Sequence, residues 1–412
     1  MDGIRLNSDK KVDNEHKTDW IMKKLFYFTF CVLLSGTVTT GCDSDGDDES
    51  DDRREEIYTP IDDSLLVGEY TDPATHVIYT LNHKESTAEV KCGHVQPWDI
   101  EYVYEPGSPE AEGRVSILEK ISVNGREYRV TRIGKFAFSM LDKLTQVSIP
   151  ASVREIGQEA FAGCTNLESV DMKEGLREIC LEAFRNCNSL LSLNLPSGLE
   201  TIGFEAFNNC LNLEAIRIPR SATDIHITAF EGCDALCSIV VEEGNAIFDS
   251  REGCNAIIKT ADNTLVVGCK GTQIPLSVTK IGPSAFRLCR GLQSIFIPGS
   301  VVSIDDHAFA HCTQLKAVTL PDGLKTIGQS VFWWSGLSEL TIPASVRSIG
   351  ACAFWMPGLK KLTSLIENPM PTFKICDLET TSPVLYVPKG AVERYKATSS
   401  WNEFLEIREL NW

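Results

Sequence analysis

The residues of this sequence best suited to chemistry are cysteines and histidines, of which the chain of 412 residues has 15 and 7. His307 and His311 are four residues apart, with Asp305, Asp306 and Cys312 beside them. Imidazole, carboxylate and thiolate groups are the ligands of zinc sites, so this cluster is the first candidate for a metal centre.

A repeated core motif accounts for these residues better than a metal does. Ala308 and Phe309, between the two histidines, belong to that motif, and the histidines occupy its variable surface positions. No Cys-x-x-Cys spacing occurs, and cysteine often serves as a small buried hydrophobe. We predict neither a metal nor a cofactor. Six cysteines share one position of the motif: Cys164, Cys187, Cys210, Cys233, Cys289 and Cys312.

Catalytic patterns are also missing from the sequence. It has no Gly-x-Ser-x-Gly, no Walker loop and no His-Glu-x-x-His. No two carboxylates are singled out by their spacing, although a glycosidase pair cannot be identified from spacing alone. We predict no catalytic residues, and an enzyme with an unrecognised site is the third and weakest hypothesis.

The motif itself recurs every 23 residues. A period of 20 to 29 residues with apolar positions in phase indicates a solenoid, whose rungs stack on one another. The Ala-Phe pair recurs in phase with an opening isoleucine, for example Ala160-Phe161 and Ala183-Phe184. The isoleucines are Ile133, Ile156, Ile179, Ile202 and Ile225, then Ile281, Ile304 and Ile327, and Ile349 after 22 residues.

Each rung is predicted to contain one strand and one tight turn. In 213–219 apolar residues alternate with others, as in a half-buried strand, and Pro219 ends it because proline cannot donate to a ladder. The Ile-Gly-x-x-Ala-Phe segment is too short for a regular helix, so we expect a tight turn with its Phe at the centre of the coil. Stacking then buries the apolar edges of neighbouring rungs.

These copies resemble the bacterial leucine-rich repeats of the BspA type. The resemblance implies an α/β repeat solenoid that is rich in strands: a right-handed leucine-rich repeat coil with one long, curved parallel sheet. We expect it to be capped at both ends. For some members the family implies adhesion to host or bacterial surface proteins, and it implies no catalytic residues.

The first 56 residues have the composition of a lipoprotein leader. Residues 1–21 are polar and precede Met22, where we expect translation to start. Residues 22–41 have a basic start and a ten-residue apolar run, as a signal peptide does. The segment 39–42 resembles a lipobox, although Thr39 replaces the usual Leu. We therefore expect Cys42 to carry the lipid anchor.

The next segment, 43–56, holds nine acidic residues and two arginines, and we expect a disordered tether. It resembles an export signal of Bacteroides-like bacteria, and a plain solvated spacer explains it equally well. We expect a lipid-anchored protein of the outer membrane, exposed on the cell surface. The formal net charge of −18 disfavours nucleic acid as a partner.

The remaining chain divides into four parts. Residues 57–130 have strand-like runs and lack the Ala-Phe pair, so we expect an N-terminal β cap. The repeats occupy 131–366 and include an enlarged rung at 240–280, with a hairpin around Asp262-Asn263. Cys254 and Cys269 flank that hairpin and are the one pair considered for a disulfide. Residues 367–412 form a C-terminal cap, with a strand and an amphipathic segment that includes Ile407.

The candidate binding surface is the outward side of the strands. Most outward residues are small or hydroxylated, which predicts an adaptable surface, and Arg217 and Phe296 are the large side chains most like hot spots. The candidate residues are Asp171, Asn194, Arg217, Phe296, Thr319 and Glu339.

A second candidate is the aromatic group Trp333, Trp334 and Trp355. The spacing predicts that Trp333 stacks on Trp355 and Trp334 on Met356. Either these side chains form an exposed patch for a partner or a glycan, or they pack beneath the C-terminal cap, which we favour. We predict a monomeric surface lipoprotein that binds a host or bacterial surface protein. A carbohydrate-capturing lipoprotein is the alternative.

Overall fold

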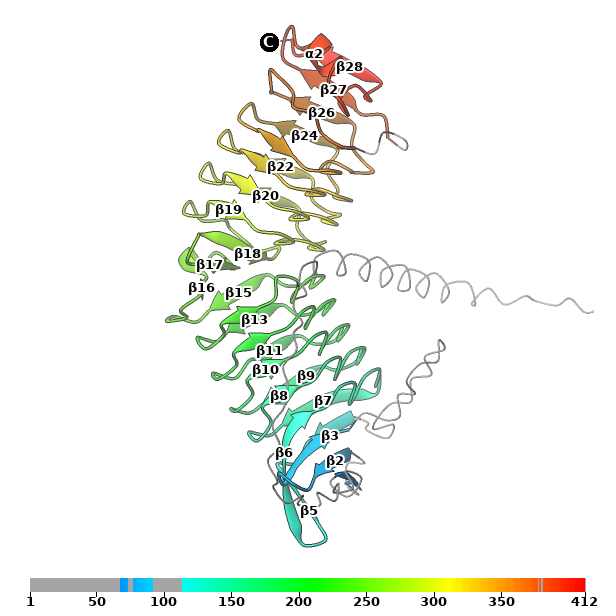
Figure 1. Cartoon of the computed structure of the whole chain (residues 1–412), viewed down its shortest axis with the longest axis vertical. Coiled ribbons are helices and arrows are strands. Elements are labelled where there is room, and N and C mark those ends of the chain that lie inside the picture. Colours follow the sequence, from blue (N-terminus) through cyan, green and yellow to red (C-terminus); the bar gives the residue numbers. More distant parts are fainter. Residues whose placement is uncertain (1–66, 73–76, 92–112, 377, 379–380, 412) are drawn as a thin grey trace, which may run out of the picture. The chain divides into compact units, whose positions relative to one another are not determined.

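A computed structural model of the chain describes residues 67–72, 77–91, 113–376, 378 and 381–411, all within one compact unit that spans 61–412. These residues form a strand-rich solenoid in which successive rungs stack along one direction (Figure 1). In the described residues no helix is long and apolar enough to cross a membrane.

Each rung contributes to two parallel sets of strands, which lie on different sides of the coil. We call the first the long-strand sheet: β4 (Gly113–Ser116), β7 (Leu144–Ile149), β9 (Ser169–Met172), β11 (Ser192–Asn194), β13 (Ala215–Ile218), β15 (Ser238–Val241), β20 (Ser294–Phe296), β22 (Ala317–Thr319), β24 (Glu339–Ile342) and β26 (Lys361–Ser364). The second is the short ladder: β8 (Glu155–Ile156), β10 (Glu178–Ile179), β12 (Thr201–Ile202), β14 (Asp224–Ile225), β19 (Lys280–Ile281), β21 (Ser303–Ile304), β23 (Thr326–Ile327) and β25 (Ser348–Ile349).

The core of the coil is a column of phenylalanine rings, one from each rung. Phe138, Phe161, Phe184 and Phe207 stack nearly parallel, with centroids 5.1 to 5.4 Å apart. These rings are fully buried. Because the faces of a ring are covered by the rings of adjacent rungs, one rung alone could not bury its own core. The column continues to Phe230, and a second column contains Phe286, Phe309, Phe332 and Phe354.

The turn that carries each Phe is tied to the next rung by main-chain hydrogen bonds. Phe161 N–H donates to the carbonyl of Ala183 at 2.8 Å, and the same bond recurs along the column. Neighbouring turns approach so closely that a Cβ at Gly157 would lie 2.8 Å from the carbonyl oxygen of Ile133. A side chain at Gly157 would therefore require a local shift of the turn, and other rungs carry Cys180 or His226 at this position.

The repeated cysteines lie beside the Phe column as the sequence predicts, and they also donate hydrogen bonds. The thiol of Cys187 donates to the carbonyl of Phe161 in the preceding rung at 3.2 Å. Equivalent bonds run from Cys164, Cys210, Cys233 and Cys312. A small apolar side chain with one weak donor thus satisfies a buried carbonyl between rungs.

The long-strand sheet is divided, whereas the sequence suggested one long sheet. Its described strands pair in the groups β4-β7-β9, β11-β13-β15, β20-β22 and β24-β26, with breaks after β9, β15 and β22. The break after β22 coincides with a rung that is one residue short after its Phe. There Gly336 N–H donates to the carbonyl of Cys312 at 3.0 Å.

The enlarged rung causes the break in the long-strand sheet after β15. It holds β16 (Phe248–Asp249), the 3₁₀ turn η2 (Arg251–Gly253), β17 (Ala256–Lys259) and β18 (Thr264–Gly268). β17 and β18 form the predicted antiparallel hairpin, with a bulge between Ile257 and Ile258. Leu265 pairs in register with Ile281, so β18 takes the place of a short-ladder strand.

This hairpin separates two hydrophobic cores. Ile257 and Val267 pack with the core of the preceding rungs, whereas Ile258 and Leu265 pack with that of the following rungs. Gly268 occupies the Phe position of this rung, because its N–H donates to the carbonyl of Ala285. A Cβ there would collide with the ring of Phe286. The Phe column therefore ends at Phe230 and starts again at Phe286.

The two cysteines considered for a disulfide lie on opposite sides of this hairpin. Cys269 belongs to the first core and Cys254 to the second, and both are free thiols in the structure. Each thiol donates to a carbonyl, Cys254 to Ala256 and Cys269 to Asn255. Nothing in their placement indicates a disulfide.

The described N-terminal strands extend the short ladder beyond the first rung. β1 (Val67–Thr71), β2 (Ile78–Asn82) and β3 (Thr87–Val90) pair antiparallel in order. β3 then pairs parallel with β6 (Arg126–Ile133), which also pairs with β5 (Lys120–Val123). These strands cover the edge of the first rung, where open backbone groups would otherwise invite other chains.

The C-terminal residues continue the long-strand sheet. β27 (Val384–Val387) pairs parallel with β26, and β28 (Glu406–Glu409) pairs with β27. The helix α2 (Val392–Lys396) is shorter than the amphipathic segment that we expected, because Ile407 lies in β28. Tyr395 and Trp401 pack edge to face at 5.1 Å and are fully buried.

Candidate functional site

The structure brings the predicted surface residues together on the outward side of the long-strand sheet. Five of the six lie in one row across the strands, in the order Asp171, Asn194, Arg217, Phe296 and Thr319, and all are exposed. Asn194 is in register with Arg217, and Phe296 with Thr319. Glu339 lies in the neighbouring row with Ser169, Ser192 and Ser294, and its register partner is Lys361. The row is thus a mostly neutral surface that is interrupted where the sheet breaks after β9 and after β15.

Arg217, one of the two predicted hot spots, forms an ion pair on this surface. Its Nε donates to Oε1 of Glu242 at 3.0 Å, and the main-chain N–H of Arg220 donates to the other oxygen. The hydrogen bond from Arg217 holds the pKa of Glu242 below its ordinary value. The arginine is therefore partly neutralised, so its contribution to binding an anion is reduced.

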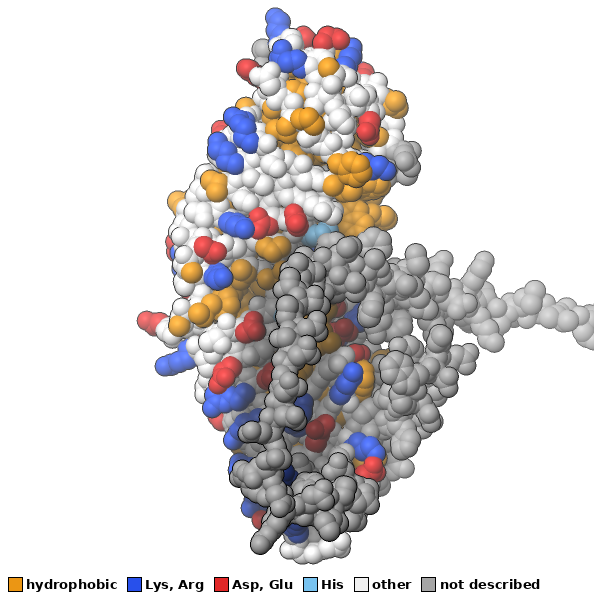
Figure 2. Space-filling view, in the orientation of Figure 1, with side chains coloured by type: hydrophobic (Ala, Val, Ile, Leu, Met, Phe, Trp, Pro, Cys, Tyr) orange, Lys and Arg blue, Asp and Glu red, His pale blue; other side chains and the backbone are white. Residues whose placement is uncertain are grey.

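Phe296 is the most unusual side chain of this surface, because it is 68% exposed. Figure 2 shows hydrophobic side chains gathered over the region from β15 to β20. Val240 in β15, Leu276 before β19 and Val302 before β21 are also exposed. Leu276 and Val302 were missed as candidates. Comparison of the rungs could have found them, because polar or small residues such as Glu174 and Glu200 fill these positions elsewhere.

The two histidines lie on the other side of the rung, in the Phe turn. His307 is half-buried, and burial together with the charge of Arg287 lowers its pKa. The ring of His311 meets that of Trp333 edge to face at 4.8 Å. In the described residues no group of three or more His, Cys, Asp and Glu is arranged to hold a metal ion.

The tryptophans are arranged differently from the predicted stack. Trp333 packs against His311 of the preceding rung, and no ring contact with Trp355 is recorded among the described residues. Trp334 is 49% exposed, whereas Met356, its predicted partner, is buried. The main-chain N–H of Trp334 donates to the carbonyl of Trp355 at 2.8 Å.

Two ion pairs join the rungs on either side of the enlarged one. Arg287 contacts Glu231 at 2.5 Å and Arg290 contacts Asp234 at 3.2 Å, in each case across 56 residues of sequence. The side chains of the Phe turns before and after the enlarged rung thus contact each other across it. Burial raises the pKa of Glu231 to about 7, even though Arg287 opposes this shift.

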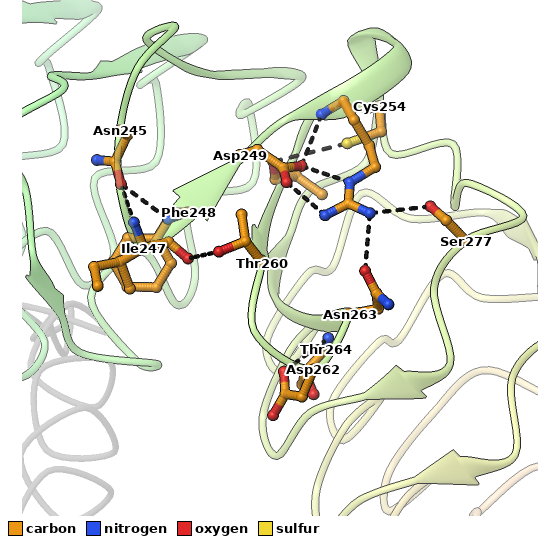
Figure 3. A network of polar contacts seen from close by, with 12 residues as sticks. Asn245, Ile247, Phe248, Asp249, Cys254, Thr260, Asp262, Asn263, Thr264 and Ser277 are labelled. Carbon is orange, nitrogen blue, oxygen red and sulfur yellow. Dashed lines mark hydrogen bonds and ion pairs between the residues drawn. The ribbon is translucent and has the colours of Figure 1, made fainter.

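A polar network around Arg251 holds the enlarged rung in shape (Figure 3). Its guanidinium donates to both carboxylate oxygens of Asp249 and to Oδ1 of Asn263 at 2.9 Å. Oδ1 of Asn245 accepts the N–H groups of Ile247 and Phe248. Each of these bonds closes a loop of the same rung, so the network supports the fold.

Cys42 and the acidic segment 43–56 lie outside the described residues.

Comparison with known proteins assigns the chain to a family. A family model for the BspA type leucine-rich repeat region, in six copies, matches residues 117–251 and 267–369, which is more than half of the chain. The chain belongs to this family. The gap at 252–266 falls in the enlarged rung, where the hairpin replaces the repeat. Comparison with curated proteins finds no significant match.

Solved structures share the fold. A leucine-rich repeat protein from Bacteroides ovatus is 22% identical, with 81% of this chain and 75% of that chain covered and a TM-score of 0.51. The pneumococcal vaccine antigen PcpA is 19% identical, with 84% and 99% covered and a TM-score of 0.56. A leucine-rich repeat protein from Eubacterium ventriosum is 20% identical, with 78% of each chain covered and a TM-score of 0.50.

The buried carboxyl of Glu231 predicts a pH dependence of stability. Its pKa is about 7 in the folded protein and ordinarily 4.5, so the folded state binds the proton more tightly. Its contribution to stability is therefore fully present below pH 4.5 and is lost as the pH rises through 7. Glu231→Gln should remove this loss, on the order of 2 to 3 kcal/mol between pH 5 and pH 8.

Urea unfolding of the wild type and Glu231→Gln across that pH range measures the difference. Glu339→Gln, which changes an exposed carboxylate of a long strand, is the matched control and should keep the wild-type slope. An identical pH dependence in Glu231→Gln and wild type would contradict this assignment.

Proposed function

We propose that this protein is a cell-surface lipoprotein whose repeats bind a protein partner, with no catalytic activity of their own. The outward side of the long-strand sheet is the binding surface. The observation that carries the proposal is the exposure of Phe296, together with Val240, on a face made mostly of small and hydroxylated side chains. A large aromatic side chain exposed among small ones is typical of a hot spot, since its burial excludes much water.

The composition of that face favours a protein over a charged polymer. Arg217 is paired with Glu242, and Asp171 with Lys173 at 2.8 Å, so the charges of the row are balanced locally. A neutral face with one aromatic anchor suits the apolar centre and polar rim of an ordinary protein interface. Membership of a family of repeat proteins that generally act as binding modules supports the same conclusion.

The surface location rests on the leader-like sequence. A basic start, an apolar run and Gly41-Cys42 are the features of a processed lipoprotein, and the acidic segment that follows suits a tether or an export signal. We propose that the lipid on Cys42 anchors the chain in the outer membrane, facing outward, and that the repeats act as a monomer. The partner is a host or bacterial surface protein.

The proposed lipid anchor on Cys42 leads to a separate prediction. Cys42→Ala should move the protein from the membrane fraction to the soluble fraction, because the acyl chains supply the membrane affinity. Fractionation with immunoblotting measures this, and protease treatment of whole cells tests exposure of the wild type. The anchor is wrong if Cys42→Ala stays in the membrane fraction at the wild-type level.

The binding surface is tested with a panel of immobilised host and bacterial surface proteins. Phe296→Ala should weaken binding by about tenfold or more, as expected for an aromatic hot spot, and leave the melting temperature unchanged. Arg217→Ala should have a smaller effect because of its pairing with Glu242. Thr223→Ala is the control, because it changes an exposed residue just before β14 of the short ladder, outside the proposed binding face.

Two results would contradict the proposal. One is wild-type binding by Phe296→Ala. The other is a hydrolase screen in which the purified protein turns over a substrate.

A further inference from the structure

The Phe turns near the C-terminal end expose a group of aromatic and apolar side chains. We call this group the aromatic edge: Leu288, His311, Trp333, Trp334 and Trp355. Trp334 is exposed and the other four are half-buried. Figure 2 shows a hydrophobic patch at the edge of the coil beside β22 and β24, with a histidine next to it. This edge is separate from the outward side of the long strands.

The backbone shows that three of these residues occupy positions poorly suited to them. Leu288, His311 and Trp334 have φ values of 58°, 60° and 55°, in the left-handed region that favours glycine and asparagine. The four rungs from Phe161 to Phe230 carry Gly163, Asn186, Asn209 and Gly232 at this position. Met140 holds the same position in the first rung with a φ of 63°, so a large side chain is tolerated here. The larger residues of the aromatic edge thus replace the glycine and asparagine of the middle rungs and enlarge the apolar surface of the turns.

The turns that carry the tryptophans have no charged side chains of their own. The turn segments 327–337 and 349–359 contain no Asp, Glu, Lys, Arg or His. Their polar side chains, such as Gln329 and Ser330, are amides and hydroxyls, and Thr313 and Gln314 lie in the preceding rung. Two charged residues contact these segments from outside: Oδ1 of Asp306 accepts the N–H of Gln329 at 2.7 Å, and the main-chain carbonyl of Lys374 accepts the N–H of Cys352 at 3.0 Å. A ligand of this edge therefore meets few charges. It has to offer a flat apolar face to an indole ring and hydroxyls to amide and hydroxyl groups.

A pyranose ring has both of those features, because its C–H groups form a weakly positive face and its hydroxyls point outward. Indole rings present a negative face and a large contact area to such a surface. Leu288, His311 and Trp334 occupy the same position in successive rungs, whose Phe rings lie 5.0 and 5.5 Å apart. That spacing is close to the length of one pyranose residue in an extended chain.

We propose that the aromatic edge binds a neutral carbohydrate chain, with one sugar ring on Trp334 and the next on His311. The ring of His311 lies 6.4 Å from that of Trp334 and meets Trp333 edge to face, so the three rings form one connected surface. This site is independent of the protein-binding face proposed above.

The substitution Trp334→Gly separates a binding role from a packing role. It removes the indole and places glycine where the backbone favours it, as at Gly163 and Gly232. We expect binding to fall by about tenfold or more, and the melting temperature to stay unchanged or rise because strain is relieved. Asn209→Gly makes the same backbone change in an earlier rung and should leave binding unchanged.

Titration of the protein with cellohexaose, xylohexaose, chitohexaose and maltohexaose at millimolar concentration, followed by tryptophan fluorescence and calorimetry, is the test. We expect at least one of these neutral chains to bind, and polygalacturonate, which is acidic, to bind more weakly. Phe296→Ala should keep sugar binding, so failure of the protein-binding face and failure of this site are distinguishable.

The proposal is overturned if none of the neutral chains binds, or if a polyproline peptide binds and the sugars do not. It is also overturned if Trp334→Gly lowers the melting temperature by several degrees and keeps sugar binding. That result would show that the indole packs for stability.

Discussion

The stacking of phenylalanine rings from rung to rung is the interaction on which this coil depends. Each ring is covered by its neighbours about 5 Å away, and the thiol beside it satisfies a carbonyl of the preceding rung. A rung without neighbours would expose its ring and leave that carbonyl unpaired. Ile, Ala, Phe and Cys therefore recur along the chain, whereas the outward positions of the long strands vary freely. The residues that stabilise the coil are thus distinct from the outward residues of the same rung.

The enlarged rung shows what happens where the column is interrupted. Gly268 replaces the ring, and the hairpin of β17 and β18 uses both of its faces to cover the two cores that result. The ion pair of Arg287 and Glu231 joins the rungs across the interruption. It buries the carboxylate of Glu231, whose Oε1 lacks a hydrogen-bond partner. An interruption is thus tolerated when each exposed core surface is covered and the turns on the other side stay in contact.

Much of this structure could be predicted from the sequence, because one period repeats and each apolar position recurs in phase. The strand, the central Phe, the buried Cys and the hairpin around Asp262-Asn263 all follow from local patterns. Contacts that depend on the rung-to-rung geometry did not follow. Examples are the pairing of Arg217 with Glu242, the ion pair of Glu231 and Arg287, and the contact of Trp333 with His311. The breaks in the long-strand sheet were missed for the same reason, since hydrogen bonding depends on how far neighbouring rungs separate.

The claim that two stacked columns divided by the hairpin hold this protein together is tested most directly by hydrogen exchange of the wild type and Phe207→Ala. Loss of this ring creates a cavity in the first column, a change that typically costs roughly 3 to 5 kcal/mol. Exchange should accelerate in the rungs of Phe184 and Phe230 and stay at the wild-type rate in those of Phe309 and Phe332. Equal acceleration on both sides of the hairpin, or acceleration confined to the rung of Phe207, would contradict the account.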